Sequence, residues 1–272
     1  MQPLAGKVAV ITGAGSGIGR ALASQLSAHG CHLALADIDA ASLEATAAPL
    51  RQEGLRLSTH TLDVADRDAM HDFAGAVLAY HGGAHLVINN AGVAVSQTIA
   101  ELRYDDFEWL MGINFWGVVH GTKAFLPHLL EQGEGHIVNL SSIFGIVSVP
   151  TQGAYNASKF AVRGFTEALR QELSGTPIRV SCVHPGGIRT NIARSARFYQ
   201  GVDGKRDAGK AAARFDRLAR TSAEQAARII IDGIQAGRPR ILVGADARFL
   251  DHLQRLLPAN YPRLLGKLLN KG

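Results

Sequence analysis

A glycine-rich turn between an apolar run and an amphipathic run is the feature that most constrains the fold of this chain. Residues 7–12 are Lys-Val-Ala-Val-Ile-Thr, a β-branched apolar run typical of a parallel strand buried on both faces. Residues 13–19 are Gly-Ala-Gly-Ser-Gly-Ile-Gly, and apolar residues then recur at helical spacing over residues 20–26. A strand, a glycine turn and a helix in this order present backbone N–H groups and the positive end of a helix dipole to a diphosphate.

The spacing of the glycines separates one type of nucleotide site from another. Gly13, Gly17 and Gly19 form a GxxxGxG pattern, whereas a strict GxGxxG pattern would need a glycine in place of Ile18. No Gly-Lys-Ser or Gly-Lys-Thr follows, which excludes a P-loop. A turn that only permits tight packing is the alternative, but the flanking strand and helix favour the nucleotide site.

The second apolar run, residues 32–37, ends in an acidic residue. Asp37 lies eighteen residues after Gly19, where an acidic side chain commonly accepts a hydrogen bond from the ribose 2′-hydroxyl of NAD and repels the 2′-phosphate of NADP. Capping of the next helix is the alternative role, but Asp39 is available for it. Arg20 is the only nearby cation that could pair with a phosphate. The sequence therefore favours NAD over NADP.

Strand-like and helix-like segments alternate along the whole chain, which predicts a doubly wound, mostly parallel sheet of seven strands in a single α/β domain. A length of 272 residues, with 47% of them hydrophobic, suffices for the core of one such domain. The predicted strands are 7–12, 32–37, 56–61, 85–89, 135–140, 178–184 and 240–243. The predicted helices are 17–29, 40–53, 66–80, 101–111, 113–131, 153–174 and 222–236.

A tyrosine and a lysine stand four residues apart in the predicted helix 153–174. At this spacing Tyr155 and Lys159 project from one face of the helix. A cation beside a phenol favours the phenolate, so the sequence predicts a Tyr155 pKa below its ordinary value of about 10. Such a phenol can give or take a proton when a carbonyl and an alcohol interconvert. The alternative is a half-buried tyrosine beside a solvated lysine. Ser142 lies thirteen residues before the tyrosine.

Two loops that follow predicted strands carry further candidates. Asp63, followed by Val64, either accepts a hydrogen bond from an adenine amino group or caps the next helix. Asn89 and Asn90 end the fourth strand, and Gly92 lets a ring approach the backbone. We expect Asn89 to be structural and Asn90 to lie on the cofactor side.

Taken together, these motifs resemble the short-chain dehydrogenase/reductase family over about residues 5–245. The resemblance implies a Rossmann-like, NAD(P)-dependent oxidoreductase that assembles as a dimer or tetramer. The order and spacing of the motifs carry it: residues 12–19, Asp63-Val64, residues 89–92, Asn114, residues 139–142, residues 155–159 and Pro185-Gly186.

The resemblance also implies a role for each site residue. Tyr155 would be the general acid in carbonyl reduction and the general base in alcohol oxidation. Lys159 would bind the nicotinamide ribose and lower the tyrosine pKa, and Ser142, with Ser141 as its rival, would hold the substrate oxygen. Asn114 would position a water that links Lys159 to solvent, unless it is an ordinary buried asparagine. The expected cofactor-binding residues are Gly13, Ser16, Gly17, Ile18, Gly19, Asp37, Asp63, Val64, Asn90, Gly92, Tyr155, Lys159, Pro185, Gly186, Ile188 and Thr190.

Residues 189–220, which follow Pro185 and Gly186, are unusually basic. They hold nine Lys or Arg against three Asp, a local charge of +6 against +5 for the whole chain. We expect a mobile, solvated lid over the substrate; attraction of an anionic substrate is the alternative. An apolar pocket, and hence a hydrophobic alcohol or ketone, is predicted from Phe144, Ile146, Val147, Val149 and Phe198.

Residues 246–272 are predicted to form a basic amphipathic helical extension to a catalytic domain of residues 1–245. Such a helix packs on its own chain or on a neighbouring subunit, or else makes peripheral contact with a membrane. The N-terminus lacks the apolar run of a signal peptide and no segment is long enough to span a bilayer, so a cytoplasmic location, with membrane association as the alternative, is expected.

The composition and the spacing of the histidines limit which other classes of ligand the protein is expected to bind. The pI is about 9.4, but no nucleic-acid-binding module is recognisable, so no nucleic-acid partner is expected. The eleven histidines lack metal-ligand spacing, which predicts no metal, and Cys31 and Cys182 are predicted to be small core residues. The leading hypothesis is an NAD-dependent alcohol dehydrogenase or carbonyl reductase. The alternatives are an NADP-dependent carbonyl or 3-oxoacyl reductase, and a nucleotide-responsive binding protein with little turnover.

Overall fold

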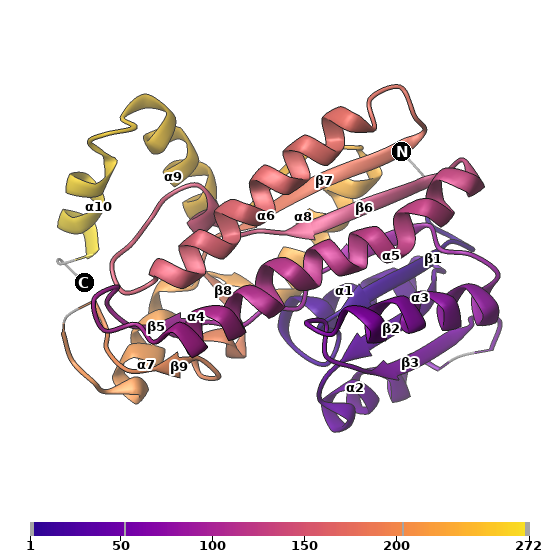
Figure 1. Cartoon of the computed structure of the whole chain (residues 1–272), viewed down its shortest axis with the longest axis horizontal. Coiled ribbons are helices and arrows are strands. Elements are labelled where there is room, and N and C mark those ends of the chain that lie inside the picture. Colours follow the sequence, from indigo (N-terminus) through magenta and orange to yellow (C-terminus); the bar gives the residue numbers. More distant parts are fainter. Residues whose placement is uncertain (1–2, 52, 203, 270–272) are drawn as a thin grey trace.

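A computed structural model describes residues 3–51, 53–202 and 204–269. One sheet of seven parallel strands runs through the molecule in the order β11-β7-β6-β4-β1-β2-β3 (Figure 1). The predicted seven-stranded, Rossmann-like sheet in one domain is confirmed. Its strands are β1 (Val8–Thr12), β2 (His32–Asp37), β3 (Leu57–Thr61), β4 (Leu86–Asn89), β6 (Gly135–Leu140), β7 (Ile178–Pro185) and β11 (Arg240–Val243).

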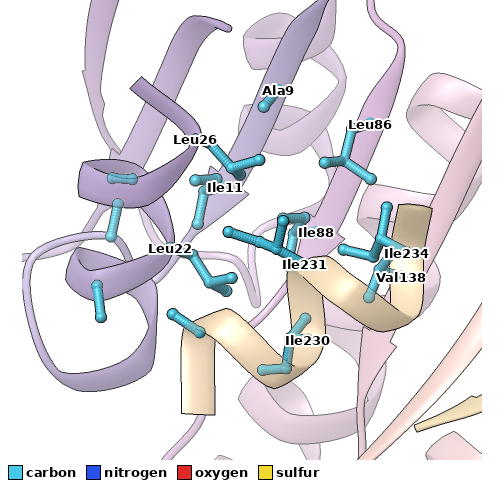
Figure 2. Packing of buried hydrophobic residues seen from close by; sticks show 14 of the residues in the cluster. Ala9, Ile11, Leu22, Leu26, Leu86, Ile88, Val138, Ile230, Ile231 and Ile234 are labelled. Atoms are coloured by element: carbon cyan, nitrogen blue, oxygen red, sulfur yellow. The ribbon is translucent and has the colours of Figure 1, made fainter. Parts of the chain in front are cut away.

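Helices cover both faces of this sheet because neighbouring residues of a buried strand point to opposite sides. Ile11 of β1 packs in one hydrophobic cluster with Leu22 and Ile231, whereas the adjacent Val10 packs in a second cluster on the other face. Figure 2 shows the first cluster, in which side chains of α1 and α8 meet the sheet. The first face is covered by α1 (Gly17–Ala28), α2 (Ala40–Ala47) and α8 (Ala223–Gln235), and the second by α3 (Arg67–His81), α5 (Gly117–Gln132) and α6 (Gly153–Glu172).

Three predicted helix boundaries differ from the structure for local reasons. The helix predicted over 40–53 ends at Ala47, and Pro49 lies in the 3₁₀ turn η1 (Ala48–Leu50) that follows. The helix predicted over 101–111 begins only at Tyr104, as α4 (Tyr104–Met111). One helix was predicted to end at residue 111 and the next to begin at residue 113. The structure joins them through a π-helical turn, η2 (Gly112–Trp116), and such turns often mark a functional position.

The basic segment 189–220 is built from several short elements and is anchored to the body of the protein. Its elements are β8 (Ile188–Arg189), η4 (Asn191–Ala193), β9 (Arg197–Phe198), α7 (Ala208–Leu218) and β10 (Thr221–Ser222), with β9 paired to β5 (Val95–Ser96). The Arg197 guanidinium lies 3.6 Å from the Trp109 ring centroid and 2.9 Å from the carboxylate of the buried Asp106. Arg197 therefore ties the segment to α4, and the expected mobility of the segment stays a prediction.

The C-terminal segment forms two helices, α9 (Ala245–Leu256) and α10 (Tyr261–Leu269), where a single helical extension was predicted. Pro258 lies between them. Figure 1 shows the pair in yellow, beside the connection from β6 to α6. Ala247 and Tyr261 are buried in a cluster with Ile143, so the described part of the segment packs on its own chain. Residues 270–272 and the side chains of residues 265 and 267–269 lie outside the described part.

Candidate active site

The residues predicted for the site gather at the carboxyl ends of neighbouring strands. β1 and β4 lie side by side at the centre of the sheet, where the strand order reverses. The loops that follow such strands form the crevice in which doubly wound sheets bind ligands. The glycine turn follows β1, Asp37 ends β2, and the remaining predicted loops follow β3, β4, β6 and β7.

The glycine turn closes tightly and leaves the start of α1 without a side-chain cap. Ser16 occupies the N-cap position but its side chain makes no capping hydrogen bond, and Gly17 has a φ of 50°. A Cβ at Gly19 would collide with the Gly13 carbonyl oxygen, and a Cβ at Gly13 would lie 2.8 Å from Ala91 Cα. Backbone N–H groups at a helix N-terminus that no side chain caps fit a diphosphate.

Asp37 and Arg20 meet at the turn on either side of Gly15. The Asp37 carboxylate accepts hydrogen bonds from the Gly15 N–H at 2.7 Å and from the Asp39 N–H at 3.1 Å. Arg20 donates to the Gly15 carbonyl and, at 2.9 Å, to Thr46 Oγ1. Asp39 caps α2, as the sequence suggested, which leaves Asp37 outside the helix cap. The guanidinium of Arg20 is therefore already engaged by the protein.

Asp63 does not cap the helix that follows β3. Asp66 is the N-cap of α3, and its side chain accepts hydrogen bonds from Asp68 and Ala69 N–H groups. Asp63 accepts instead from the Ala65 N–H at 2.9 Å, within the loop after β3. The helix-cap alternative for Asp63 is therefore wrong. Val64, next to it, is buried against the start of α5.

The loop after β4 is fastened to the glycine turn by an amide. Asn90 Nδ2 donates to the carbonyl oxygens of Thr12, at 2.9 Å, and of Gly13, at 3.1 Å. Asn89 is buried and donates to Asn139 Oδ1 at 2.8 Å, which makes it the structural residue of the pair. A Cβ at Gly92 would lie 3.3 Å from Asn114 Oδ1 and 3.5 Å from Lys159 Nζ, so this loop passes close to the lysine.

Tyr155 and Lys159 lie on α6, facing the end of β6. Lys159 is only 3% exposed, its Nζ donates to the Leu140 carbonyl at 3.1 Å, and the same Nζ lies 5.6 Å from the Tyr155 ring centroid. The alternative of a solvated lysine is therefore wrong. Phe144 packs edge-on against the Tyr155 ring at 6.1 Å between centroids.

Of the two neighbouring serines, only Ser142 is placed to bond the tyrosine. The Ser142 side chain lies close enough to the Tyr155 phenol to lower its pKa, and Ser142 Oγ also accepts from the Phe144 N–H at 3.1 Å. Ser141 donates to the Lys159 carbonyl oxygen at 2.8 Å and is buried beneath α6. The structure thus brings Ser142, Tyr155 and Lys159 together and excludes Ser141 from the group.

Burial controls both pKa values in this pair. It raises the pKa of Tyr155 to about 12, against the smaller lowering effect of the Ser142 hydrogen bond, and it lowers the pKa of Lys159 to about 8. The predicted lowering of the Tyr155 pKa is therefore wrong when only the protein's own groups act on the phenol. Loss of water from around the phenol dominates its pKa, and the same burial disfavours the charge on the neighbouring ammonium.

Asn114 holds two parts of the site together. It is 0% exposed and lies in the π-helical turn η2. Its Oδ1 accepts from the Val93 N–H at 2.8 Å, and its Nδ2 donates to the Val93 carbonyl at 3.0 Å and to Ser158 Oγ at 3.2 Å. Ser158 lies between Tyr155 and Lys159 on α6. The Asn114 side chain therefore joins the loop after β4 to the helix that carries the pair.

The loop after β7 closes onto the glycine turn. Pro185 ends β7 and is followed by Gly186, while Ile188 is buried in the core. A Cβ at Gly17 would lie 3.0 Å from Thr190 Cγ2, so the two loops touch. A cavity of about 400 Å³ beside this contact is lined by residues of α1, by the loop and by the start of α8.

Two polar side chains at this edge were not predicted as site residues. His184 is fully buried, and its Nδ1 lies 3.1 Å from the Ser142 carbonyl oxygen. Burial lowers the pKa of His184 to about 4, so the ring is neutral near pH 7, and a carbonyl only accepts, so Nδ1 carries the proton. Asp246 accepts a hydrogen bond from the Gly187 N–H at 2.6 Å. An acid three residues after the end of the last strand was the available signal for Asp246.

The predicted apolar pocket needs one correction. Ile146 and Val147 are buried against Ala247 and Tyr261, so they support the C-terminal helices and do not face an open pocket. Phe144 and Val149 are only partly buried in that cluster. Among the described residues, no group of three or more His, Cys, Asp or Glu is placed to hold a metal ion. No described helix is both long and apolar enough to cross a membrane.

Comparison with known proteins agrees with this geometry. A family profile described as short chain dehydrogenase matches residues 7–200. The chain therefore belongs to the short-chain dehydrogenase/reductase family, whose members are oxidoreductases that act on small molecules.

Individual relatives match over nearly the whole chain. SadH of Mycobacterium tuberculosis is 49% identical over 268 residues, which cover 97% of this chain and 96% of SadH. A Drosophila melanogaster protein named dehydrogenase/reductase SDR family protein 7-like is 33% identical and covers 97% of this chain and 81% of its own. The crystal structure of a Burkholderia phymatum short-chain dehydrogenase/reductase in complex with NAD superposes with a TM-score of 0.86 at 33% identity, covering 94% of this chain and 95% of that one.

Proposed function

We propose that this protein transfers a hydride between NAD(H) and a secondary alcohol or ketone. The observation that carries the proposal is the grouping of Ser142, Tyr155 and the buried Lys159 at the same sheet edge as the uncapped glycine turn. A phenol, a hydroxyl and an ammonium at one point serve an oxygen that changes between carbonyl and alcohol. The bound nicotinamide would supply the hydride chemistry.

The proton in the reaction would belong to Tyr155. With a pKa near 12, the phenol holds its proton at neutral pH and can donate it to the oxygen of a carbonyl as that oxygen gains negative charge. Ser142 would donate a second hydrogen bond to the same oxygen. In alcohol oxidation the same residues would act in reverse, with Tyr155 as the base once the Lys159 ammonium and the bound nicotinamide ribose together favour its phenolate. Lys159 would bond the nicotinamide ribose, and Asn114 would position a water for proton exchange with solvent.

NAD is the proposed cofactor, with NADP less favoured. Asp37 ends β2 and places a carboxylate beside the turn, where it would accept from a ribose 2′-hydroxyl and repel a phosphate. Arg20, the cation that might otherwise bind that phosphate, is engaged by Gly15 and Thr46. The similar Burkholderia phymatum enzyme was crystallised with NAD. Gly13, Ser16, Gly17, Ile18 and Gly19 would hold the diphosphate, and Asp63, Val64, Asn90 and Gly92 the adenosine and nicotinamide ribose side.

A hydrophobic substrate is supported by what surrounds the tyrosine. The Phe144 ring lies edge-on to Tyr155, and Val149 is only partly buried in the adjoining cluster. Pro185, Gly186, Ile188 and Thr190 would receive the nicotinamide opposite this apolar wall. Assembly as a homodimer or homotetramer in the cytoplasm completes the proposal.

The test measures the absorbance of reduced nicotinamide after the purified protein is mixed with NAD(H) and each of a panel of secondary alcohols and ketones. The wild-type protein is expected to turn over at least one hydrophobic member with NAD(H). Tyr155→Phe, which removes only the hydroxyl, is expected to lower turnover at least a hundredfold and to bind NADH with an unchanged Kd by fluorescence titration. NADH binding without turnover of any substrate would favour a nucleotide-responsive binding protein instead.

A further inference from the structure

The loop after β7 is bonded to the first turn of the C-terminal helix α9. Gly187, in the centre of that loop, donates its backbone N–H to Asp246 Oδ2 at 2.6 Å, and the neighbouring Gly186 N–H donates to the Val243 carbonyl at 2.9 Å. An N–H that donates to a carboxylate makes a charge-assisted hydrogen bond, which is stronger than a bond between neutral groups. The conformation of the loop therefore depends on a side chain about sixty residues further along the chain.

The backbone around Asp246 is shaped to bring its carboxylate close to the loop. A Cβ at Gly186 would collide with both carboxylate oxygens, and a Cβ at Gly244 would collide with Asp246 Oδ1. Gly244 has a φ of 102°, a conformation that side-chain-bearing residues rarely adopt. Two glycines thus make room for one carboxylate, on the loop and on the turn that leads into α9.

The same pair of C-terminal helices also contacts the segment that follows Ser142. Tyr261, the first residue of α10, accepts a hydrogen bond at its hydroxyl from the Ser148 N–H at 3.0 Å. Ala247, one residue after Asp246, is buried against Ile143 and Ile146. The position of α9 is therefore fixed against the β6–α6 connection, and through Asp246 it fixes the loop after β7.

We propose that Asp246 is a positioning residue, which holds the loop of residues 185–190 in the conformation that receives the nicotinamide. This inference rests on the proposed function, because it concerns the nicotinamide half of the dinucleotide. The adenosine half is served by Asp37 and the glycine turn, and the glycine turn meets this loop at Thr190, three residues beyond the bond from Gly187 to Asp246. Loss of the Asp246 carboxylate therefore weakens binding of the nicotinamide half only.

Two ligands separate the halves experimentally: NADH, which carries both, and ADP-ribose, which lacks the nicotinamide. We expect Asp246→Ala to raise the Kd for NADH about tenfold, the effect of losing one charge-assisted hydrogen bond, and to leave the Kd for ADP-ribose unchanged. Asp246→Asn keeps an oxygen acceptor in the same place and is expected to restore NADH binding to within about threefold of wild type. Asp72→Ala, which removes an exposed acid on α3, is the matched control and is expected to change neither Kd.

The outcomes divide cleanly. Equal weakening of NADH and ADP-ribose in Asp246→Ala would mean a general loosening of the fold and would overturn the positioning role. An unchanged NADH affinity in that variant, with wild-type protein binding both ligands, would overturn this inference and leave the proposed function intact. Wild-type protein that binds neither ligand would overturn both.

Discussion

Replacement of Lys159 by methionine should stabilise the fold while abolishing activity. The lysine side chain is 3% exposed, and its Nζ has the Leu140 carbonyl as a hydrogen-bond acceptor at 3.1 Å. A cation with so little solvation raises the free energy of the folded state unless it is fully compensated. Methionine has a similar length, no charge and a flexible chain that fills the same space.

The magnitude follows from the lysine pKa. Burial lowers that pKa from 10.5 to about 8, and at about 1.4 kcal/mol per pKa unit the difference is about 3 kcal/mol at neutral pH. Loss of the hydrogen bond to the Leu140 carbonyl destabilises the variant by about 1–2 kcal/mol. The Lys159→Met protein is therefore expected to be more stable by about 1–2 kcal/mol at pH 7.

The sign of the pH dependence gives a sharper test than the absolute gain. Because the folded-state pKa is depressed, the unfolded chain binds more protons than the folded protein between pH 8 and 10.5, so wild-type stability rises with pH in this window. The methionine variant lacks this contribution, and all other groups titrate alike in both proteins. The advantage of the variant should therefore shrink steadily above pH 8.

Urea unfolding measures the difference in stability at one protein concentration and without nucleotide, at roughly pH 7, 8.5 and 9.5, which run from below this window into it. Lys159→Arg, which retains the charge, serves as the control and should show no gain. A constant difference across the pH series would refute the reasoning, as would a methionine variant that is less stable than wild type at neutral pH.

Two further substitutions test the neighbouring contacts. Asp37→Ala should lower the preference for NAD over NADP by about tenfold, because the carboxylate no longer repels a 2′-phosphate; fluorescence titration with NADH and NADPH measures it, and an unchanged ratio would mean that another group reads the ribose. His184→Ala should lower kcat about fivefold, the effect of roughly 1 kcal/mol from the hydrogen bond that holds the Ser142 carbonyl, while the Kd for NADH stays constant. His184→Asn retains an N–H donor at the same branch of the side chain and should recover most of the loss, and failure of this rescue would count against a positioning role.

The sheet and the position of the site could be predicted because their signals are local. Each central strand is a short β-branched run followed within a few residues by its functional loop, as with β1 and Gly13 or β4 and Asn90. Parallel strands then bring these loops together without further information. The helix boundaries that were wrong depended on similarly local details, such as Pro49 and the π-helical turn around Asn114.

The pKa values and the C-terminal contacts could not be predicted because they depend on packing between distant segments. The i, i+4 spacing of Tyr155 and Lys159 shows that they are neighbours, but it does not show that β6, η3 (Ile143–Gly145) and the loop after β4 remove water from both. The bond from Gly187 to Asp246 exists only because β11 lies beside β7 and α9 turns back over that edge. Arg197 appears in the sequence as one charge among many, and only folding brings Asp106 and Trp109 to it.

The bonds that hold the site cross between elements that are far apart in the sequence. Asn114 joins the loop after β4 to α6, His184 joins β7 to Ser142, and Asp246 joins α9 to the loop after β7. None of the three bonds lies within a single helix or strand, so each can be removed while the ladder of hydrogen bonds in the sheet stays intact. Geometry in this site is therefore separable from stability. Loss of a supporting residue should alter kcat or ligand affinity more than it alters unfolding. Loss of the Lys159 charge should abolish activity and at the same time stabilise the fold, because burial of that charge destabilises the folded state.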